Sequence, residues 1–360
     1  MKLINQLIYQ VFVRNYSKEG TFKEVEKDLP RLKELGVDII YLLPIHPIGE
    51  DKRKGTYGSP YAIKDYKAIS PDLGDEKSFK SLVDKTHQLG MKIIMDMVFN
   101  HTSPDNVLAT SHPEYYFYKN GKRGNRVGDW SDIVDLDTLR DDTQEYLVSV
   151  LQYWLSFGVD GFRFDVASTI PASFFARARK VMGPKPFFLA ECIDEGFANY
   201  LKSVNAIYET DETLNQYFDC LYNYNWLDIM IRYLKGNDKL ENIIKAIKNN
   251  DKDIIRLNCL ENHDKDRIAN YFSKEKDLYE WMRFAFNLKG NMFIYMGQEY
   301  GIKHKPELFE KDPVIWPKEE NETYHLYKQL IKENKQKPVV EDDIEIKGDI
   351  VILNNKKYRL

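Results

Sequence analysis

The feature that most constrains this chain is an alternation of short apolar runs with amphipathic helical stretches along most of its length. The apolar runs predict eight strands, at residues 6–13, 37–43, 91–98, 161–165, 187–191, 216–221, 254–260 and 292–296. Residues 37–43 are nearly all apolar, as a strand covered by helices on both faces should be. Strands that alternate with helices form a parallel sheet with right-handed crossovers. Eight such units predict a closed (β/α)8 TIM barrel of the α/β class.

The first helical stretch carries recognisable ends. Thr21 and Glu24 have the spacing of a capping box, and Gly36 ends the periodic run that follows. Pro30 is expected to kink this helix or to start a second one. The unit around residues 200–235 has the weakest helical period, because its aromatic residues blur the pattern.

Two segments depart from the repeating pattern. The connection between residues 100 and 137 is long and polar, and it has no clear period. Long connections in compact domains are usually functional, so we expect residues 101–136 to form a small subdomain inserted after the third strand, over the barrel mouth. Residues 312–360 predict one helix and three short strands, a truncated C-terminal tail domain. The catalytic barrel is then expected to occupy residues 1–311.

Composition excludes several classes of partner. The 360 residues carry a net charge of −4, so the chain has no basic surplus for nucleic acid or an anionic membrane. No apolar run reaches the ~20 residues that span a bilayer, and no convincing secretion signal is visible, which predicts a cytoplasmic location. Cys192, Cys220 and Cys259 are expected to be buried, reduced thiols. No nucleotide or metal motif is present, and no pattern indicates the oligomeric state.

Polar residues gather where the predicted strands end. Barrel enzymes build their active sites at the C-terminal ends of the strands. In this chain four strand ends carry such residues: Asp96, Asn100, His101, Arg163, Asp165, Glu191, His263 and Asp264. Because a closed barrel brings these ends together, the side chains are expected to converge.

Two of the carboxylates have different surroundings. Arg163 and Asp165 share one face of their strand, and the arginine is expected to lower the pKa of the aspartate, as a nucleophile requires. Glu191 follows apolar and small residues, where burial favours the neutral form that a general acid needs. Such a pair is typical of a retaining glycosidase, in which the carboxyl groups lie ~5–5.5 Å apart. Asp264 would stabilise positive charge on the sugar in the transition state.

Each residue taken alone has a structural alternative. Asp165 or Glu191 could form a buried ion pair or cap a helix. His101 or His263 could be a satisfied polar side chain, and Tyr61 could be a packing residue. The joint pattern over four strand ends favours the catalytic interpretation.

At these residues the sequence resembles the α-amylase superfamily, glycoside hydrolase family thirteen. The resemblance rests on four separated motifs: DMVFNH at 96–101, GFRFDVAS at 161–168, LAEC at 189–192 and ENHD at 261–264. Softer matches cover residues 36–49 and 290–301. Together they run from about residue 7 to residue 301 in the order expected for the family.

The resemblance implies net retention on an α-glycosidic substrate, without an organic cofactor. It implies that Asp165 is the nucleophile, Glu191 the acid/base and Asp264 the transition-state carboxylate. It implies substrate-binding roles for Tyr61, His101, Arg163 and His263. It implies supporting roles for Asp96 and Asn100.

The sequence departs from the family pattern at two places. Asn100 matches a calcium ligand of many relatives, but GFRFDVAS is not followed by the Lys-His that often supplies another ligand. We therefore predict no metal site, since calcium lacks a full ligand set. Exo-acting relatives usually carry an aspartate just before the position of Tyr61, where this chain has Ser59 and Pro60. This favours an open cleft.

These features predict an α-amylase-like hydrolase that cleaves internal α-1,4-glucosidic bonds of starch or maltodextrins by double displacement. Its partner would be an α-glucan oligo- or polysaccharide. The alternatives are an α-glucan transglycosylase and an α-1,6- or exo-acting α-glucosidase of the same superfamily. A non-catalytic binding relative is disfavoured, because such relatives lose carboxylates that this chain retains.

Overall fold

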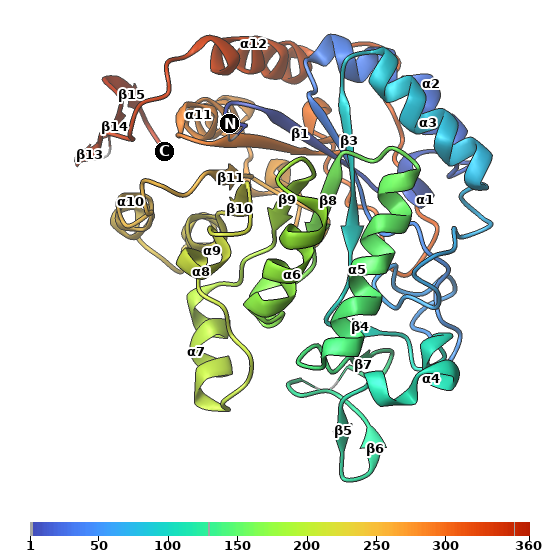
Figure 1. Ribbon diagram of the computed structural model, residues 1–360. Helices are drawn as coiled ribbons and strands as arrows, with labels where there is room; N and C mark the ends of the chain where they lie inside the picture. The colour runs from blue at the N-terminus through green and yellow to red at the C-terminus, as the bar shows by residue number, and fades with distance from the viewer. Residues whose placement is uncertain (1–2, 129, 349) are drawn as a thin grey trace.

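A closed parallel barrel forms the centre of the molecule (Figure 1). The computed structural model describes residues 3–128, 130–348 and 350–360. Within these residues, eight strands follow the ring order β1-β12-β11-β10-β9-β8-β3-β2. Their bounds are β1 Leu7–Val11, β2 Ile39–Leu42, β3 Lys92–Met97, β8 Gly161–Phe164, β9 Phe187–Ala190, β10 Cys220–Tyr222, β11 Arg256–Asn258 and β12 Asn291–Tyr295. The predicted (β/α)8 barrel is confirmed.

Helices surround the barrel and cover the outer faces of its strands. The larger ones are α2 Phe22–Leu35, α3 Glu76–Gln88, α5 Asp141–Ser156, α6 Ala172–Met182, α7 Glu195–Ser203, α9 Tyr224–Leu234, α10 Leu240–Lys248 and α11 Glu275–Asn287. Short helices and 3-10 turns complete the connections: α1 Val13–Tyr16, α8 Asp211–Leu214, η2 Ala167–Thr169, η3 Ile268–Tyr271 and η4 Gln298–Tyr300. None of the helices in the described residues is long and apolar enough to cross a membrane.

Two local predictions about α2 are corrected. Pro30 lies inside one continuous helix, so no second helix starts there, while the alternative of a kink stays a prediction. Leu29 and Leu32 are fully buried on either side of the exposed Pro30, and their burial holds the chain on the barrel despite the missing N–H. Thr21 occupies the N-cap position, but its side chain caps no backbone N–H. The capping box belongs to α3 instead, between Asp75 and Ser78.

The sixth barrel strand is shorter than predicted. The sequence pattern predicted a strand over residues 216–221, whereas β10 covers only Cys220–Tyr222. Helix α8 precedes it and the chain turns through residues 215–217, so that stretch cannot extend into a strand. Its place in the ring, between β9 and β11, is as expected.

The segment after β3 folds back on itself below the barrel in Figure 1. Its elements are β4 His101–Thr102, α4 Leu108–Ser111, η1 Pro113–Tyr115, β5 Tyr118–Lys119, β6 Lys122–Arg123 and β7 Val134–Asp135. β4 pairs antiparallel with β7, so the two ends of the segment are held together at the barrel mouth. The boundaries of this insertion as a subdomain remain a prediction.

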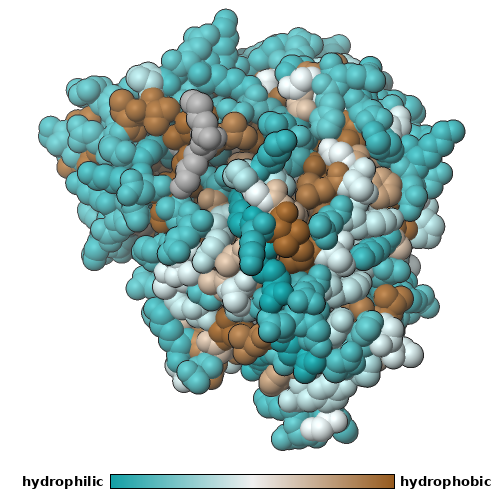
Figure 2. Space-filling view, viewed as in Figure 1, coloured by the Kyte–Doolittle hydropathy of each residue, from teal (hydrophilic) through white to brown (hydrophobic). Residues whose placement is uncertain are grey.

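The C-terminal part lies on the opposite side of the molecule in Figure 1. Helix α12 Glu322–Gln336 buries Tyr324 and Tyr327, and it packs on α11. A small antiparallel sheet follows, made of β13 Ile344–Lys347, β14 Ile350–Leu353 and β15 Lys356–Tyr358. The face of the molecule in Figure 2 is largely hydrophilic, with hydrophobic side chains in separate patches. The division of the chain at residue 311 remains a prediction.

Candidate active site

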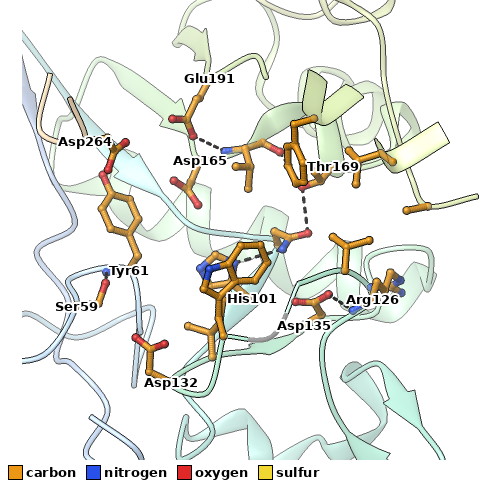
Figure 3. Close-up of a pocket in the computed structure, with 18 of the residues that line it drawn as sticks. Ser59, Tyr61, His101, Arg126, Asp132, Asp135, Asp165, Thr169, Glu191 and Asp264 are labelled. Carbon is orange, nitrogen blue, oxygen red and sulfur yellow. Dashed lines mark hydrogen bonds between the residues drawn. The ribbon is translucent and has the colours of Figure 1, made fainter. Parts of the chain in front are cut away.

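A cavity of about 490 Å³ opens between the C-terminal ends of the barrel strands and the inserted segment (Figure 3). Seven of the nine predicted site residues line it: Tyr61, Asn100, His101, Asp165, Glu191, His263 and Asp264. The other two, Asp96 and Arg163, are fully buried beside them. The convergence expected from the strand ends is therefore present in the structure.

Arg163 connects the carboxylates of the site. Its Nη1 lies 2.8 Å from Asp96 Oδ1 and 2.8 Å from Asp165 Oδ1, and its Nη2 lies 2.8 Å from Glu191 Oε1. Strand β8 places this side chain inside the barrel, because Phe162 and Phe164 alternate with it and pack against Phe188 on the other face. One guanidinium thus holds three carboxyl groups next to one another.

Glu191 accepts hydrogen bonds on both carboxyl oxygens. The backbone N–H of Val166 donates to Oε2 at 2.7 Å, and the hydroxyl of Tyr224 donates to Oε1 at 3.0 Å. Val166 adopts a left-handed backbone with φ 38°, which is uncommon for a β-branched residue. This conformation, one residue after Asp165, aims the N–H at Glu191. The carboxyl group is therefore fixed from two sides.

Arg163 lowers the pKa of Asp165 as predicted, but the net shift of that pKa is upward. Burial raises the pKa of Asp165 well above its usual range, and the charges of Glu191 and Asp96 add to this, while Arg163 lowers it. The guanidinium is shared among three carboxylates, so its attraction does not offset desolvation and repulsion at Asp165. Asp165 therefore retains a proton more readily than the sequence suggested.

Tyr61 and His263 form one hydrogen-bonded unit in the wall of the cavity. The Gln10 amide nitrogen donates to His263 Nδ1 at 3.0 Å, which leaves the ring proton on Nε2. Nε2 lies 2.6 Å from the hydroxyl of Tyr61, whose own proton goes to Asp96 Oδ2 at 3.1 Å. The two rings stack with centroids 5.4 Å apart. Burial lowers the pKa of His263, so the imidazole is neutral.

His101, Asn100 and Asp264 complete the predicted set. Burial lowers the pKa of His101 to about 4, so this imidazole is also neutral at neutral pH. Asn100 Oδ1 accepts a hydrogen bond from Thr169 at 3.1 Å. Asp264 is half-exposed at the cavity, and its backbone N–H donates to Asn262 Oδ1 at 3.0 Å.

Residues 10–131 and 126–344 match the family model for the α-amylase catalytic domain. The chain belongs to the α-amylase family. The resemblance inferred from the four motifs is thereby confirmed, and with it the prediction of an α-amylase-like barrel enzyme at the level of the family.

Solved structures of the α-amylase family share this fold along nearly the whole chain. An α-amylase from Lactobacillus plantarum superposes with a TM-score of 0.92 at 39% identity, covering 97% of this chain and 85% of that one. A noncanonic maltogenic α-amylase from Thermotoga neapolitana gives 0.84 at 33% identity, covering 98% and 86%.

Curated relatives match over a smaller share of their own length. An α-1,4-glucan:maltose-1-phosphate maltosyltransferase from Salinibacter ruber is 32% identical over 45% of this chain and 28% of that protein. Neopullulanase 2 from Thermoactinomyces vulgaris is 27% identical over 87% of this chain and 55% of its own. This chain thus spans about half or less of these two proteins.

Several cavity residues of this α-amylase-family chain were not singled out by sequence. Lys54 and Asp132 form an ion pair of 2.7 Å that joins the loop after β2 to the inserted segment. Phe197, Leu201 and Ile207 form an apolar wall on the side of α7. These residues lie in connections with no periodic pattern and meet through the fold, so no local signal marks them.

Among the residues that the structure describes, no group of three or more His, Cys, Asp or Glu side chains is arranged to hold a metal ion. Asn100 instead bonds Thr169, so the residues present do not fit a calcium site built on Asn100. The prediction that the enzyme works without calcium stays a prediction. Cys192, Cys220 and Cys259 are free and buried, as predicted.

Proposed function

We propose that this chain is a retaining glycoside hydrolase that cleaves internal α-1,4-glucosidic bonds of starch or maltodextrins. One observation carries the proposal. The Asp165 and Glu191 carboxyl groups are each 2.8 Å from a nitrogen of the same buried guanidinium, at the wall of the cavity. Such close placement suits the ~5–5.5 Å separation of retaining enzymes rather than the wider gap of inverting ones. We also propose, from the sequence alone, a cytoplasmic location.

In the proposed mechanism, Glu191 gives its proton to the glycosidic oxygen as Asp165 attacks the anomeric carbon. The bond to the leaving sugar breaks, and a glycosyl ester of Asp165 forms. Glu191, now ionised, takes a proton from water, whose oxygen attacks the anomeric carbon and releases Asp165.

The remaining cavity residues would bind the sugar at the cleavage point. Tyr61 offers an aromatic ring, and the neutral His101 can donate or accept hydrogen bonds with sugar hydroxyls, while His263 would hold Tyr61 beside the sugar. Asp264 would balance positive charge on the sugar ring in the transition state. Asp96 would support them by orienting Arg163 and Tyr61.

Internal cleavage is supported by Ser59 and Pro60, the two residues that precede Tyr61. An exo-acting enzyme needs a polar barrier that holds the terminal hydroxyl groups. Ser59 lines the cavity with only a short hydroxyl, which already accepts the N–H of Tyr61 at 3.2 Å, and Pro60 has no N–H. The exo-acting alternative draws support from the Lys54–Asp132 ion pair, whose polar groups also line the cavity.

The transglycosylase alternative is supported by the apolar wall of Phe197, Leu201 and Ile207. An apolar surface can hold the face of an acceptor sugar and limit water, so a sugar hydroxyl competes better for the glycosyl ester. The match to a maltosyltransferase from Salinibacter ruber points the same way.

A product time course tests these proposals together. Incubation with a long maltodextrin should first give a spread of mid-length oligosaccharides. Glucose or one single oligomer from the earliest time point would overturn internal cleavage. Products longer than the starting chain would establish transfer, and their absence at high maltodextrin concentration would exclude it as the main activity.

A further inference from the structure

Tyr224 is a buried residue that contacts the proposed acid/base without lining the cavity described above. It is the first residue of α9, directly after the short strand β10 and one intervening asparagine. Its hydroxyl donates to Glu191 Oε1 at 3.0 Å and accepts from Asn262 Nδ2 at 2.8 Å. The phenol therefore connects Glu191 to the loop that carries Asp264.

The direction of this hydrogen-bond chain is fixed by its far end. Asn262 Oδ1 accepts from the backbone N–H groups of Asp264 and Lys265, both at 3.0 Å. Its amide nitrogen must then face Tyr224, and it donates to the phenol oxygen. The hydroxyl proton of Tyr224 consequently points to Glu191, which can only accept it. A hydrogen bond donated to a carboxyl group favours the ionised form of that group.

We propose that Tyr224 is a positioning residue for Glu191. Its hydroxyl holds the carboxyl group in one orientation and favours the ionised form that takes the proton from water in the second half of the reaction. The inference rests on the proposed acid/base role of Glu191. Together with the N–H of Val166, it means that each carboxyl oxygen has its own fixed donor.

Other charged and titratable groups face this pair from neighbouring elements. They are Asp96 on β3, Arg163 and Asp165 at β8, Tyr222 on β10, and His263, Asp264 and Lys265 after β11. Substituting Tyr224 by phenylalanine leaves all of them in place. A change in the pH profile of that variant would therefore report the lost hydroxyl.

Tyr222, the last residue of β10, offers a matched control. It is 1% exposed, yet its hydroxyl has no hydrogen-bond partner among the described residues. Tyr222→Phe removes the same atom from another buried tyrosine ring, two residues before Tyr224. It should leave kcat, KM and the pH profile as in the wild type.

The experiment compares Tyr224→Phe with Tyr222→Phe on maltodextrin. For Tyr224→Phe we expect kcat to fall roughly tenfold, as for loss of one hydrogen bond to a charged group, with KM changed by less than about twofold. The alkaline limb of kcat/KM should move up by about one pH unit, because losing a donor to the carboxylate favours its protonated form. Unfolding temperatures of both variants should stay close to that of the wild type.

A double variant separates this inference from the function it rests on. In a Glu191→Gln background, with an activated substrate that needs no acid, Tyr224→Phe should cause no further loss, since it acts only through Glu191. An equal loss in both backgrounds, a change in KM alone, or no difference between the two tyrosine variants would overturn the inference. If Glu191→Gln leaves maltodextrin turnover unchanged, the proposed function fails instead.

Discussion

At the scale of single residues, the site depends on one buried guanidinium group, that of Arg163, which contacts three carboxyl groups. Arg163 contacts Asp96, Asp165 and Glu191 at once, so the three carboxyl groups share one positive charge. The proposed roles of Asp165 and Glu191 nevertheless differ in what each does to the substrate. Asp165 forms a bond to carbon in every turnover, whereas the acid function of Glu191 matters only when the leaving group needs a proton.

That difference predicts that two variants depend differently on the leaving group of the substrate. Asp165→Asn should lower kcat/KM roughly a thousandfold or more on both maltodextrin and α-glucosyl fluoride, because no glycosyl ester can form. Glu191→Gln should lose far more on maltodextrin than on the fluoride, whose leaving group departs without protonation. Steady-state kinetics of both variants on both substrates measure this. Equal losses in all four cases would contradict the separate roles.

A site residue could be predicted from sequence where it directly follows the apolar run of a single strand. Asp165 and Glu191 could be placed because each ends an apolar run, and a barrel brings such ends together. Tyr224 and Lys54 could not, since they reach the site through partners far along the chain. The net upward shift of the pKa of Asp165 was missed for the same reason. The sequence displays the adjacent Arg163, but not the other carboxylates that compete for it.

At the scale of elements, the helix starts show how a sequence signal can fail. Thr21 has the spacing of a capping residue before α2, but its side chain bonds no backbone N–H. Asn321, which begins α12, accepts the N–H of Tyr324 at 2.9 Å and donates to the carbonyl of Tyr300 at 2.9 Å. Spacing alone cannot reveal which side chain turns towards the helix.

Truncating the side chains at these two N-cap positions is expected to lower the free energy of unfolding by different amounts. Asn321→Ala should lower the free energy of unfolding by about 1 kcal/mol, the usual cost of losing an N-cap. Thr21→Ala should change it by less than about 0.5 kcal/mol, because no cap bond is lost. Urea unfolding of both variants against the wild type gives the comparison. A larger loss at Thr21 than at Asn321 would reverse the assignment of the caps.

At the scale of the whole molecule, the barrel was the most predictable feature. Its strands are buried on both faces and therefore appear as apolar runs, which the period of the intervening helices separates. The start of β10 was predicted too early in the sequence, because α8 is only four residues long and gives no periodic signal. The contacts among the loops at the barrel mouth are set by the closed ring as a whole, and no local pattern encodes them.

Two buried histidines predict how the stability of the molecule depends on pH. Burial lowers the pKa of His46 and of His101 from 6.5 to about 4. Above pH 6.5 both are neutral in the folded and unfolded states. As pH falls from 6.5 towards 4, only the unfolded chain takes up the protons, so up to roughly 3 kcal/mol of stability is lost per histidine.

His46 allows the pH prediction to be tested away from the cavity. It contacts the carbonyl of Ala68 and the ring of Trp154 and is 1% exposed. His46→Gln should be less stable than the wild type at pH 7, and the difference should shrink towards pH 4.5, because glutamine does not titrate. Urea unfolding at both pH values measures it, and a constant difference would mean that His46 does not contribute to acid sensitivity.

The central claim, that Asp165 forms a covalent bond to the substrate in a retaining reaction, can be tested directly by trapping. A fluorinated glucosyl fluoride, whose ester is hydrolysed slowly, should add one sugar to the intact protein. Peptide mass spectrometry should place that sugar on Asp165, and Asp165→Asn should remain unlabelled. A label on another residue, or turnover without any label and with inversion at the anomeric carbon, would contradict the account.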